Sequence, residues 1–176
     1  MINIFRKKEF LQDSLEGFVD IHNHILPGID DGSPDLETSI RLIRRFNKLG
    51  VSNFICTPHI MNDYYPNTPE IIIKALDKVK LALIDTPDLK NVKVRAGAEY
   101  MMDQHFMELL ESGEILAIKD NYILVEISYF QPPINLNEIL FQLQTRGYKP
   151  VLAHPERYAY YHGKEISKYE ELKNRG

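Results

Sequence analysis

The stretch Asp20-Ile-His-Asn-His-Ile-Leu-Pro-Gly-Ile-Asp-Asp-Gly32 follows an apolar start, Phe18-Val19, and places two histidines one residue apart. Residues i and i+2 of a β-strand point the same way, so His22 and His24 can aim both imidazoles at one point if the strand continues through them. Two neutral imidazoles with carboxylates nearby suit a divalent transition metal such as zinc, manganese or iron. The alternative is a structural role for two partly buried histidines, because an H-x-H pair alone is a weak signal.

Composition bounds the class of protein. The chain has 176 residues, 44% hydrophobic and 26% charged, which is ordinary for one globular domain. A net charge of -4 gives no case for nucleic-acid binding. The single cysteine, Cys56, excludes an intrachain disulfide, and its place in an apolar run predicts a buried thiol. The apolar runs are too short to span a bilayer, and the N-terminus lacks the apolar segment of a signal peptide, so a cytoplasmic location is expected.

Apolar strands alternate with amphipathic helices along the chain. Residues 1–17 are expected to form a leader. Its short helix is expected to pack onto the domain through its apolar residues, Ile2, Ile4, Phe5, Phe10 and Leu11. Strands are expected at 18–21, 51–57, 92–96, 122–126 and 150–154. Helices are expected at 34–49, 68–84, 105–110, 135–145 and 160–174, with Ser33 and Thr68 as N-caps and a capping box from Asn135 to Glu138. This alternation indicates parallel βα units in one α/β domain, residues 18–176.

Each expected strand ends on a histidine or a carboxylate: His22 and His24, His59, Glu99, Glu126 and His154. In a parallel β/α barrel these ends share the face where active sites lie. Burying a glutamate without a partner is costly, and a metal ion would supply the missing positive charge. Several ions would explain so many ligands, and adjacent metals suit phosphoryl-oxygen chemistry.

Other interpretations remain open for single residues. His59 can be a loop histidine, and Glu99 and Glu126 can be salt-bridged rim residues. Asp30 and Asp31 can be turn residues ahead of a helix. Surface positions are expected for His105 and His162, and a packing or rim cluster for Tyr158, Tyr160 and Tyr161. No Cys-x5-Arg phosphate loop surrounds the cysteine, which disfavours a cysteine-based phosphatase.

Five segments follow one another in a specific order: 19–32, Cys56-Thr-Pro-His59, Gly97-Ala-Glu99, Leu124-Val-Glu-Ile-Ser128 and Leu152-Ala-His-Pro-Glu-Arg-Tyr158. Together they resemble the PHP (polymerase and histidinol phosphatase) metallo-hydrolase superfamily. Within it they are most similar to the bacterial tyrosine-protein phosphatases of capsular and exopolysaccharide loci, the CpsB/YwqE type.

The resemblance implies a distorted, TIM-like β/α barrel with up to three divalent ions, often manganese, with iron or zinc as alternatives. By this resemblance His22, His24 and Glu99 hold one ion. Glu99 bridges to a second ion, which Glu126 and His154 also hold. Asp31 and His59 hold a third. Arg157 binds the substrate phosphate, a role that its planar fork suits, and His154 and Arg157 are the catalytic candidates.

The implied function is hydrolysis of phosphotyrosine by water that the metals activate, on a tyrosine kinase that controls capsular or exopolysaccharide synthesis. Two alternatives are a small-molecule phosphoesterase of the histidinol-phosphatase kind and an inactive metal-binding fragment. The family pattern continues with two more strands and an Asp-x-His ligand pair, which we expect to be missing here, after about five βα units. A barrel open at this point would expose sheet edges, so the chain is expected to be either a homo-oligomer or poorly stable alone.

Overall fold

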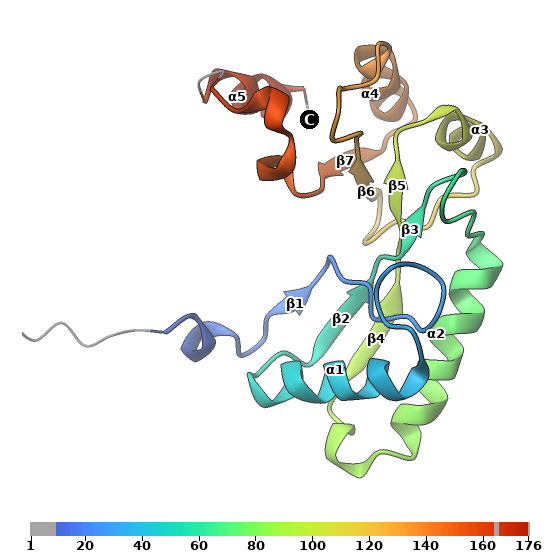
Figure 1. The fold of residues 1–176 in the computed structure, drawn as a ribbon, viewed down its shortest axis with the longest axis vertical. Helices are drawn as coiled ribbons and strands as arrows, with labels where there is room; N and C mark the ends of the chain where they lie inside the picture. The colour runs from blue at the N-terminus through green and yellow to red at the C-terminus, as the bar shows by residue number, and fades with distance from the viewer. Residues whose placement is uncertain (1–9, 164–165, 176) are drawn as a thin grey trace, which may run out of the picture.

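Two parallel sheets organise the computed structural model, which describes residues 10–163 and 166–175 (Figure 1). The first sheet has the order β1-β2-β4, with β1 at Val19–Asp20, β2 at Asn53–Cys56 and β4 at Lys93–Ala96. The second has the order β3-β5-β6-β7, with bounds His59–Ile60, Glu99–Met101, Tyr122–Glu126 and Lys149–Leu152. Every pairing between these strands is parallel. The predicted α/β class is confirmed, whereas closure into a barrel stays a prediction.

Helices connect the strands and flank both sheets (Figure 1). The α-helices are α1 (Leu36–Lys48), α2 (Pro69–Ile84), α3 (Gln104–Ser112), α4 (Leu136–Thr145) and α5 (Ser167–Asn174). Short 3-10 helices are η1 (Leu11–Ser14), η2 (Pro87–Leu89), η3 (Pro155–Arg157) and η4 (Ala159–Tyr161). In the described ranges, no helix is long and apolar enough to cross a membrane.

The helix starts were predicted with mixed success. Thr68 caps α2, since its side chain accepts a hydrogen bond from the Ile71 N–H, as predicted. Ser33 does not cap α1. Asp35 does, because its carboxylate accepts from Thr38 N at 2.7 Å, while the Ser33 hydroxyl is turned to the Asp35 carbonyl. The capping box at Asn135 is also wrong, because that side chain makes no cap hydrogen bond.

The expected last helix, 160–174, is two separate helices, η4 and α5. Gly163 lies between them with φ +78°, a left-handed conformation that ends a helix readily when the residue is glycine. Tyr158 and Tyr161 are buried. Tyr158 stacks on Tyr160 and Tyr161 meets Tyr160 edge to face, which confirms the predicted packing cluster.

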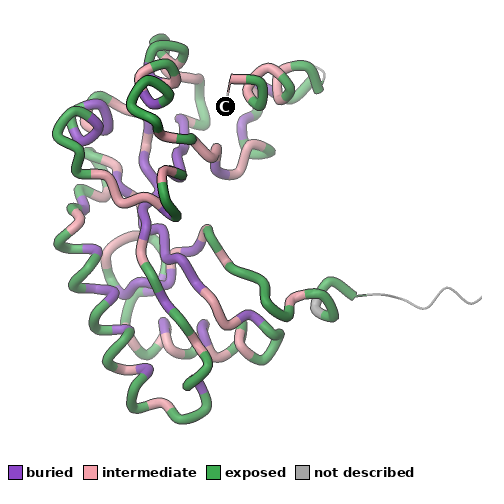
Figure 2. Tube along the Cα trace, turned by 180° about the vertical axis from the view of Figure 1, so that it is seen from behind, coloured by how far each residue is buried: buried purple, intermediate pink, exposed green. Residues whose placement is uncertain are grey.

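The core follows the inner faces of the sheets and helices, and Figure 2 shows it as buried segments along both halves of the molecule. Cys56 is fully buried, as predicted. The leader differs from the prediction, because Phe10 and Leu11 are 59% and 80% exposed, and Leu15 instead packs against the core. The other leader residues of that prediction, Ile2, Ile4 and Phe5, lie outside the described residues.

Two of the expected strands are each followed, after a two-residue break, by a second short strand. Thr57-Pro58 separates β2 from β3, and Gly97-Ala98 separates β4 from β5. Proline has no N–H to give to a ladder, which explains the first break. The register resumes beyond the breaks, where His59 of β3 pairs with Glu99 of β5. These two residues therefore begin strands of the second sheet rather than end strands of the first.

Candidate metal centre

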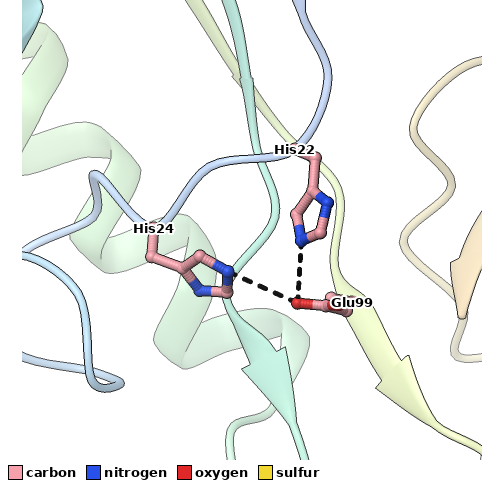
Figure 3. A group of neighbouring side chains, drawn as sticks. All are labelled: His22, His24 and Glu99. Carbon is pink, nitrogen blue, oxygen red and sulfur yellow. Dashed lines mark ion pairs between the residues drawn. The ribbon is translucent and has the colours of Figure 1, made fainter. Parts of the chain in front are cut away.

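His22 and His24 reach the centre from a loop. β1 ends at Asp20, so the strand does not continue through the two histidines. Asn23 fixes the loop instead: its N–H donates to Thr57 Oγ1 at 3.1 Å, and its side-chain amide donates to the Ile55 carbonyl at 3.2 Å. The imidazoles on either side of Asn23 still point at one carboxylate, that of Glu99 (Figure 3).

Glu99 lies in the middle of the histidine cluster, and its side chain is fully buried. Its Oε2 atom lies 3.2 Å from His22 Nε2, and 3.3 Å from both His24 Nε2 and His59 Nδ1. Its other oxygen, Oε1, lies 3.0 Å from His154 Nε2. One buried carboxylate thus gathers four histidines from three separate segments of the chain.

Glu126 and Asp31 extend the cluster on either side of His59. Glu126 ends β6 and is buried, with Oε1 2.7 Å from His59 Nδ1 and Oε2 3.6 Å from His154 Nε2. Asp31 is exposed and places Oδ1 3.7 Å from His59 Nε2. The loop-histidine interpretation of His59 is wrong, because this residue belongs to β3 and lies among three carboxylates.

His154 follows β7 by two residues, in a left-handed conformation with φ +31°. This conformation is uncommon for a residue with a side chain and is often found at functional sites. Here it turns the chain into η3 while the imidazole stays against Glu99.

Asp30 supports the centre without belonging to a candidate ligand group. Its buried carboxylate lies 2.7 Å from His24 Nδ1 and accepts hydrogen bonds from the N–H groups of Gly32 (3.0 Å) and His59 (3.3 Å). A proton on His24 Nδ1 leaves the lone pair of Nε2 on the Glu99 side, the arrangement that orients a metal-ligating histidine. A simple turn interpretation of Asp30 is therefore wrong.

The carboxylates control the protonation of the histidines. Burial alone would lower the pKa of His24, but the Asp30 and Glu99 carboxylates outweigh it and raise that pKa to about 10. Burial of His59 is likewise outweighed by Glu126, which raises the pKa of this imidazole. Burial would raise the pKa of Glu99, but the neighbouring imidazoles of His154, His22 and His24 hold that pKa far below its usual value. In the metal-free chain, protonated histidines therefore pair with the buried carboxylates.

The donor set fits divalent metal ions. Three overlapping groups have ligand atoms within 4.8 Å of one another: His22, His24 and Glu99; His24, Asp31 and His59; His59, Glu99 and Glu126. Donors bound to one ion at about 2.1 Å lie roughly 3–3.5 Å apart, as the Glu99 contacts do. Buried atoms at these contacts, including Glu99 Oε2, Glu126 Oε1 and His59 Nδ1, have no well-formed hydrogen bond, which metal coordination would remedy. His154 joins no group but contacts both glutamates.

A cleft of about 360 Å³ opens beside the centre. Asp31, His59 and Glu126 line it together with Arg157, and an aromatic rim contributes Tyr64, Tyr65, Tyr129 and Phe130. Arg157 is exposed and sits at the end of η3, three residues after His154. The structure thus brings the phosphate-binding candidate and three of the metal-ligand candidates to one cavity.

Sequence analysis did not identify the aromatic residues of this cleft. The Tyr65 ring stacks on His59 with centroids 5.5 Å apart, and Asn67 donates to the His59 carbonyl at 2.8 Å. Both belong to a polar loop after His59 whose only sequence signal is its Asn, Tyr and Pro content. Outside the centre, His105 pairs with Glu108 and His162 is exposed against the Glu156 carbonyl, so both are peripheral, as predicted.

Comparison with known proteins gives consistent matches. Residues 18–176 match the family described as "Capsular polysaccharide synthesis, CpsB/CapC". Tyrosine-protein phosphatase YwqE of Bacillus subtilis is 36% identical over 142 residues, which cover 79% of this chain and 54% of YwqE. Tyrosine-protein phosphatase CpsB of Streptococcus pneumoniae is 29% identical over 141 residues, 80% of this chain and 57% of CpsB.

The fold comparison points the same way. A crystal structure from work on YwqE of Bacillus subtilis and CpsB of Streptococcus pneumoniae, described as "unique metal-dependent tyrosine phosphatases", superposes with a TM-score of 0.81 and 31% identity. The match covers 90% of this chain and 64% of that one. The chain spans about half the length of the curated relatives it matches.

Proposed function

Because the chain belongs to the CpsB/CapC family of capsular polysaccharide synthesis, we propose that it forms the catalytic centre of a metal-dependent protein-tyrosine phosphatase. The relatives YwqE and CpsB carry that activity in their names, and the similar solved structure is described as metal-dependent. The observation that carries the proposal is the buried Glu99 carboxylate, contacted by four histidines beside a cleft that holds an arginine.

The proposed ligand sets are His22, His24 and Glu99 for one ion; Glu99, Glu126 and His154 for a second; and Asp31 with His59 for a third. The overlap of the candidate groups at Glu99 and His59 supports closely spaced ions. Manganese is the proposed metal, with iron or zinc as alternatives, because imidazole and carboxylate donors suit all three.

When bound, such ions lower the pKa of water and stabilise charge on phosphoryl oxygens. The side chains of the protein bind the substrate and orient the ligands. Arg157 offers planar N–H donors to two phosphate oxygens, and the aromatic rim of the cleft accommodates the tyrosine ring. Asp30 holds His24 in one orientation, so the donors stay in place. The buried side of the centre excludes water from Glu99 and Glu126.

The substrate and the complete architecture belong to the same proposal. The substrate is phosphotyrosine on a kinase that controls capsular or exopolysaccharide synthesis, in line with the family description. The two parallel sheets are parts of one distorted barrel. The support is that β3 follows β2 directly and β5 follows β4, so that the second sheet continues the first.

Kinetics with defined metal content test this function. The 176-residue chain is stripped with a chelator, reloaded with Mn²⁺ and assayed on a phosphotyrosine peptide and on histidinol phosphate. We expect turnover of the peptide that disappears with the metal and in Glu99→Gln. Glu108→Gln, which breaks a histidine–glutamate pair on α3, a helix that does not line the cleft, should keep it.

The outcomes separate the candidate functions. Faster hydrolysis of histidinol phosphate than of the peptide would favour a small-molecule phosphoesterase. Stoichiometric metal binding with turnover of neither substrate would favour a metal-binding module without catalysis. Metal-independent turnover that survives Glu99→Gln would refute the proposed centre altogether.

A further inference from the structure

A cation–aromatic pair stands at the cleft beside the candidate metal centre. The Arg157 guanidinium carbon lies 4.6 Å from the centroid of the Tyr129 ring, and both residues line the cleft with His59 and Glu126. Within the described ranges, the guanidinium makes no hydrogen bond or ion pair. Its donors are therefore uncommitted, while one of its faces is held by the ring.

Two hydrogen bonds anchor the backbone just before Tyr129. Before it, the Ile127 N–H donates to the Tyr158 hydroxyl at 3.2 Å. Next to it, the Tyr160 hydroxyl donates to the Ser128 carbonyl at 2.8 Å. The buried tyrosine cluster thus fixes the loop after β6, and Tyr129 projects from a rigid base although it is 40% exposed.

Tyr129 also contacts the segment that carries Arg157. Its ring centroid lies 5.6 Å from that of His154 and 6.0 Å from that of Tyr158. Arg157 in turn donates its backbone N–H to the His154 carbonyl at 2.9 Å. The ring therefore bridges β6 to η3 and touches both the metal-ligand candidate and the phosphate-binding candidate.

We propose that Tyr129 is a positioning residue, which holds Arg157 over the cleft and so sets where a phosphate binds relative to the metal centre. The inference rests on the proposed function, in which Arg157 binds phosphate. The chemistry is compatible because a ring attracts the face of a guanidinium, whereas a phosphate accepts from the N–H groups at its edge. A flexible arginine at an exposed site would lose affinity by the fraction of time it spends elsewhere.

Orthophosphate binding to the Mn²⁺-loaded chain tests the proposal without requiring turnover. Isothermal titration calorimetry should show Tyr129→Ala binding orthophosphate about 2- to 5-fold more weakly, the range of an exposed cation–aromatic contact. Tyr129→Phe keeps the ring and should stay within about twofold of the parent chain. Metal content, measured in parallel, should not change in either variant.

A matched control comes from the strand that precedes Tyr129. Tyr122 at the start of β6 is 39% exposed and carries Lys149 over its ring at 5.1 Å, so it makes the same kind of contact away from the cleft. Tyr122→Ala should leave orthophosphate affinity unchanged. The chain has no tryptophan, so Tyr129→Trp adds a single fluorescent reporter whose emission should change on orthophosphate binding.

A double-mutant cycle decides whether Tyr129 acts through Arg157. In an Arg157→Ala background, Tyr129→Ala should have no further effect on orthophosphate affinity. An equal loss in both backgrounds would overturn the proposal, as would unchanged affinity of the single Tyr129→Ala variant or a parent chain that binds no orthophosphate. A chain that shows the expected cycle but hydrolyses no phosphotyrosine would refute the proposed function and leave the positioning role supported.

Discussion

Replacing Asp30 by alanine removes the carboxylate that joins two ligand candidates from separate segments. It is fully buried, lies 2.7 Å from His24 Nδ1, and accepts backbone N–H groups from Gly32 and His59. The variant should therefore be less stable without metal and bind metal more weakly. Both effects follow from the contact between Asp30 and His24. Without metal it stabilises the protonated imidazole of His24, and with metal it orients the same imidazole as a ligand.

The magnitudes come from these contacts. A hydrogen bond to a charged group contributes about 1.5–3 kcal/mol, so Asp30→Ala should lower the free energy of unfolding of the metal-free chain by at least that much at pH 7. With a urea slope of about 2 kcal/mol/M, the midpoint should fall by about 1 M. Loss of an orienting carboxylate should weaken Mn²⁺ binding about 10- to 100-fold.

The pH dependence gives a second readout on the metal-free chain. The pKa of His24 is raised from its ordinary 6.5 to about 10. The stability that this shift contributes is fully present below pH 6.5 and is lost as the pH rises through about 10. The stability difference between the parent chain and Asp30→Ala should therefore shrink as the pH is raised past about 10.

Urea denaturation in chelator and Mn²⁺ calorimetry measure the two effects, with Asp35→Ala as the control. Asp35 also accepts a backbone N–H at 2.7 Å, but it caps α1 at the surface. Its loss should lower the free energy of unfolding by about 1 kcal/mol and leave metal affinity unchanged. If both variants bound Mn²⁺ as the parent does, or if the stability difference did not shrink above pH 10, Asp30 would not be the support of this centre.

Four further changes have defined outcomes. Apparent Mn²⁺ affinity should fall as the pH drops below about 10, because the pKa of His24 is raised to about 10, that of His59 is also raised, and metal binding must displace their protons. The affinity should fall about tenfold per pH unit for each proton displaced. An affinity that calorimetry finds independent of pH would contradict this. Arg157→Ala should lower kcat/KM on a phosphotyrosine peptide, by an amount equivalent to a loss of about 1.5–3 kcal/mol in transition-state stabilisation. Arg157→Lys should restore only part of this loss. Cys56→Ser should keep kcat, because the thiol is buried and its pKa raised to about 12; lost kcat in a folded variant would imply a covalent role. Gly32→Ala should lower both Tm and metal affinity, because the new Cβ would overlap the His24 backbone; unchanged values would show that the loop adapts.

The sequence predicted the elements and the ligand candidates because both depend on local pattern. Apolar runs and helical spacing gave the α/β class, and polar residues at the ends of those runs indicated the cluster that the structure brings together at Glu99. Cap residues were less predictable. Ser33 and Asp35 are both good caps in isolation, and the choice depends on tertiary contacts, since the Ser39 hydroxyl next to Ser33 ties α1 to the Ile25 carbonyl.

The supporting residues could not be predicted for a different reason. Asp30 looks like any turn aspartate until the fold places His24 and His59 against it, six and 29 residues away. Tyr129 is one aromatic residue among many, and its contact with Arg157 crosses from β6 to η3. Such roles depend on long-range geometry, which periodicity does not encode.

The interruptions of the strands explain how apolar sheets can present so polar a centre. A continuous strand would alternate its side chains between two faces and would bury part of the histidine–carboxylate set in the core. The break at Pro58 lets His59 begin a new strand, and Glu99 N still donates to the Pro58 carbonyl at 3.0 Å, which keeps the two ligand candidates in register. The break at Gly97 is fixed by close packing, because a Cβ there would lie 3.0 Å from the Ile118 side chain. Proline and glycine at these two positions thus align the ligand candidates of two strands without a side chain of their own in the centre.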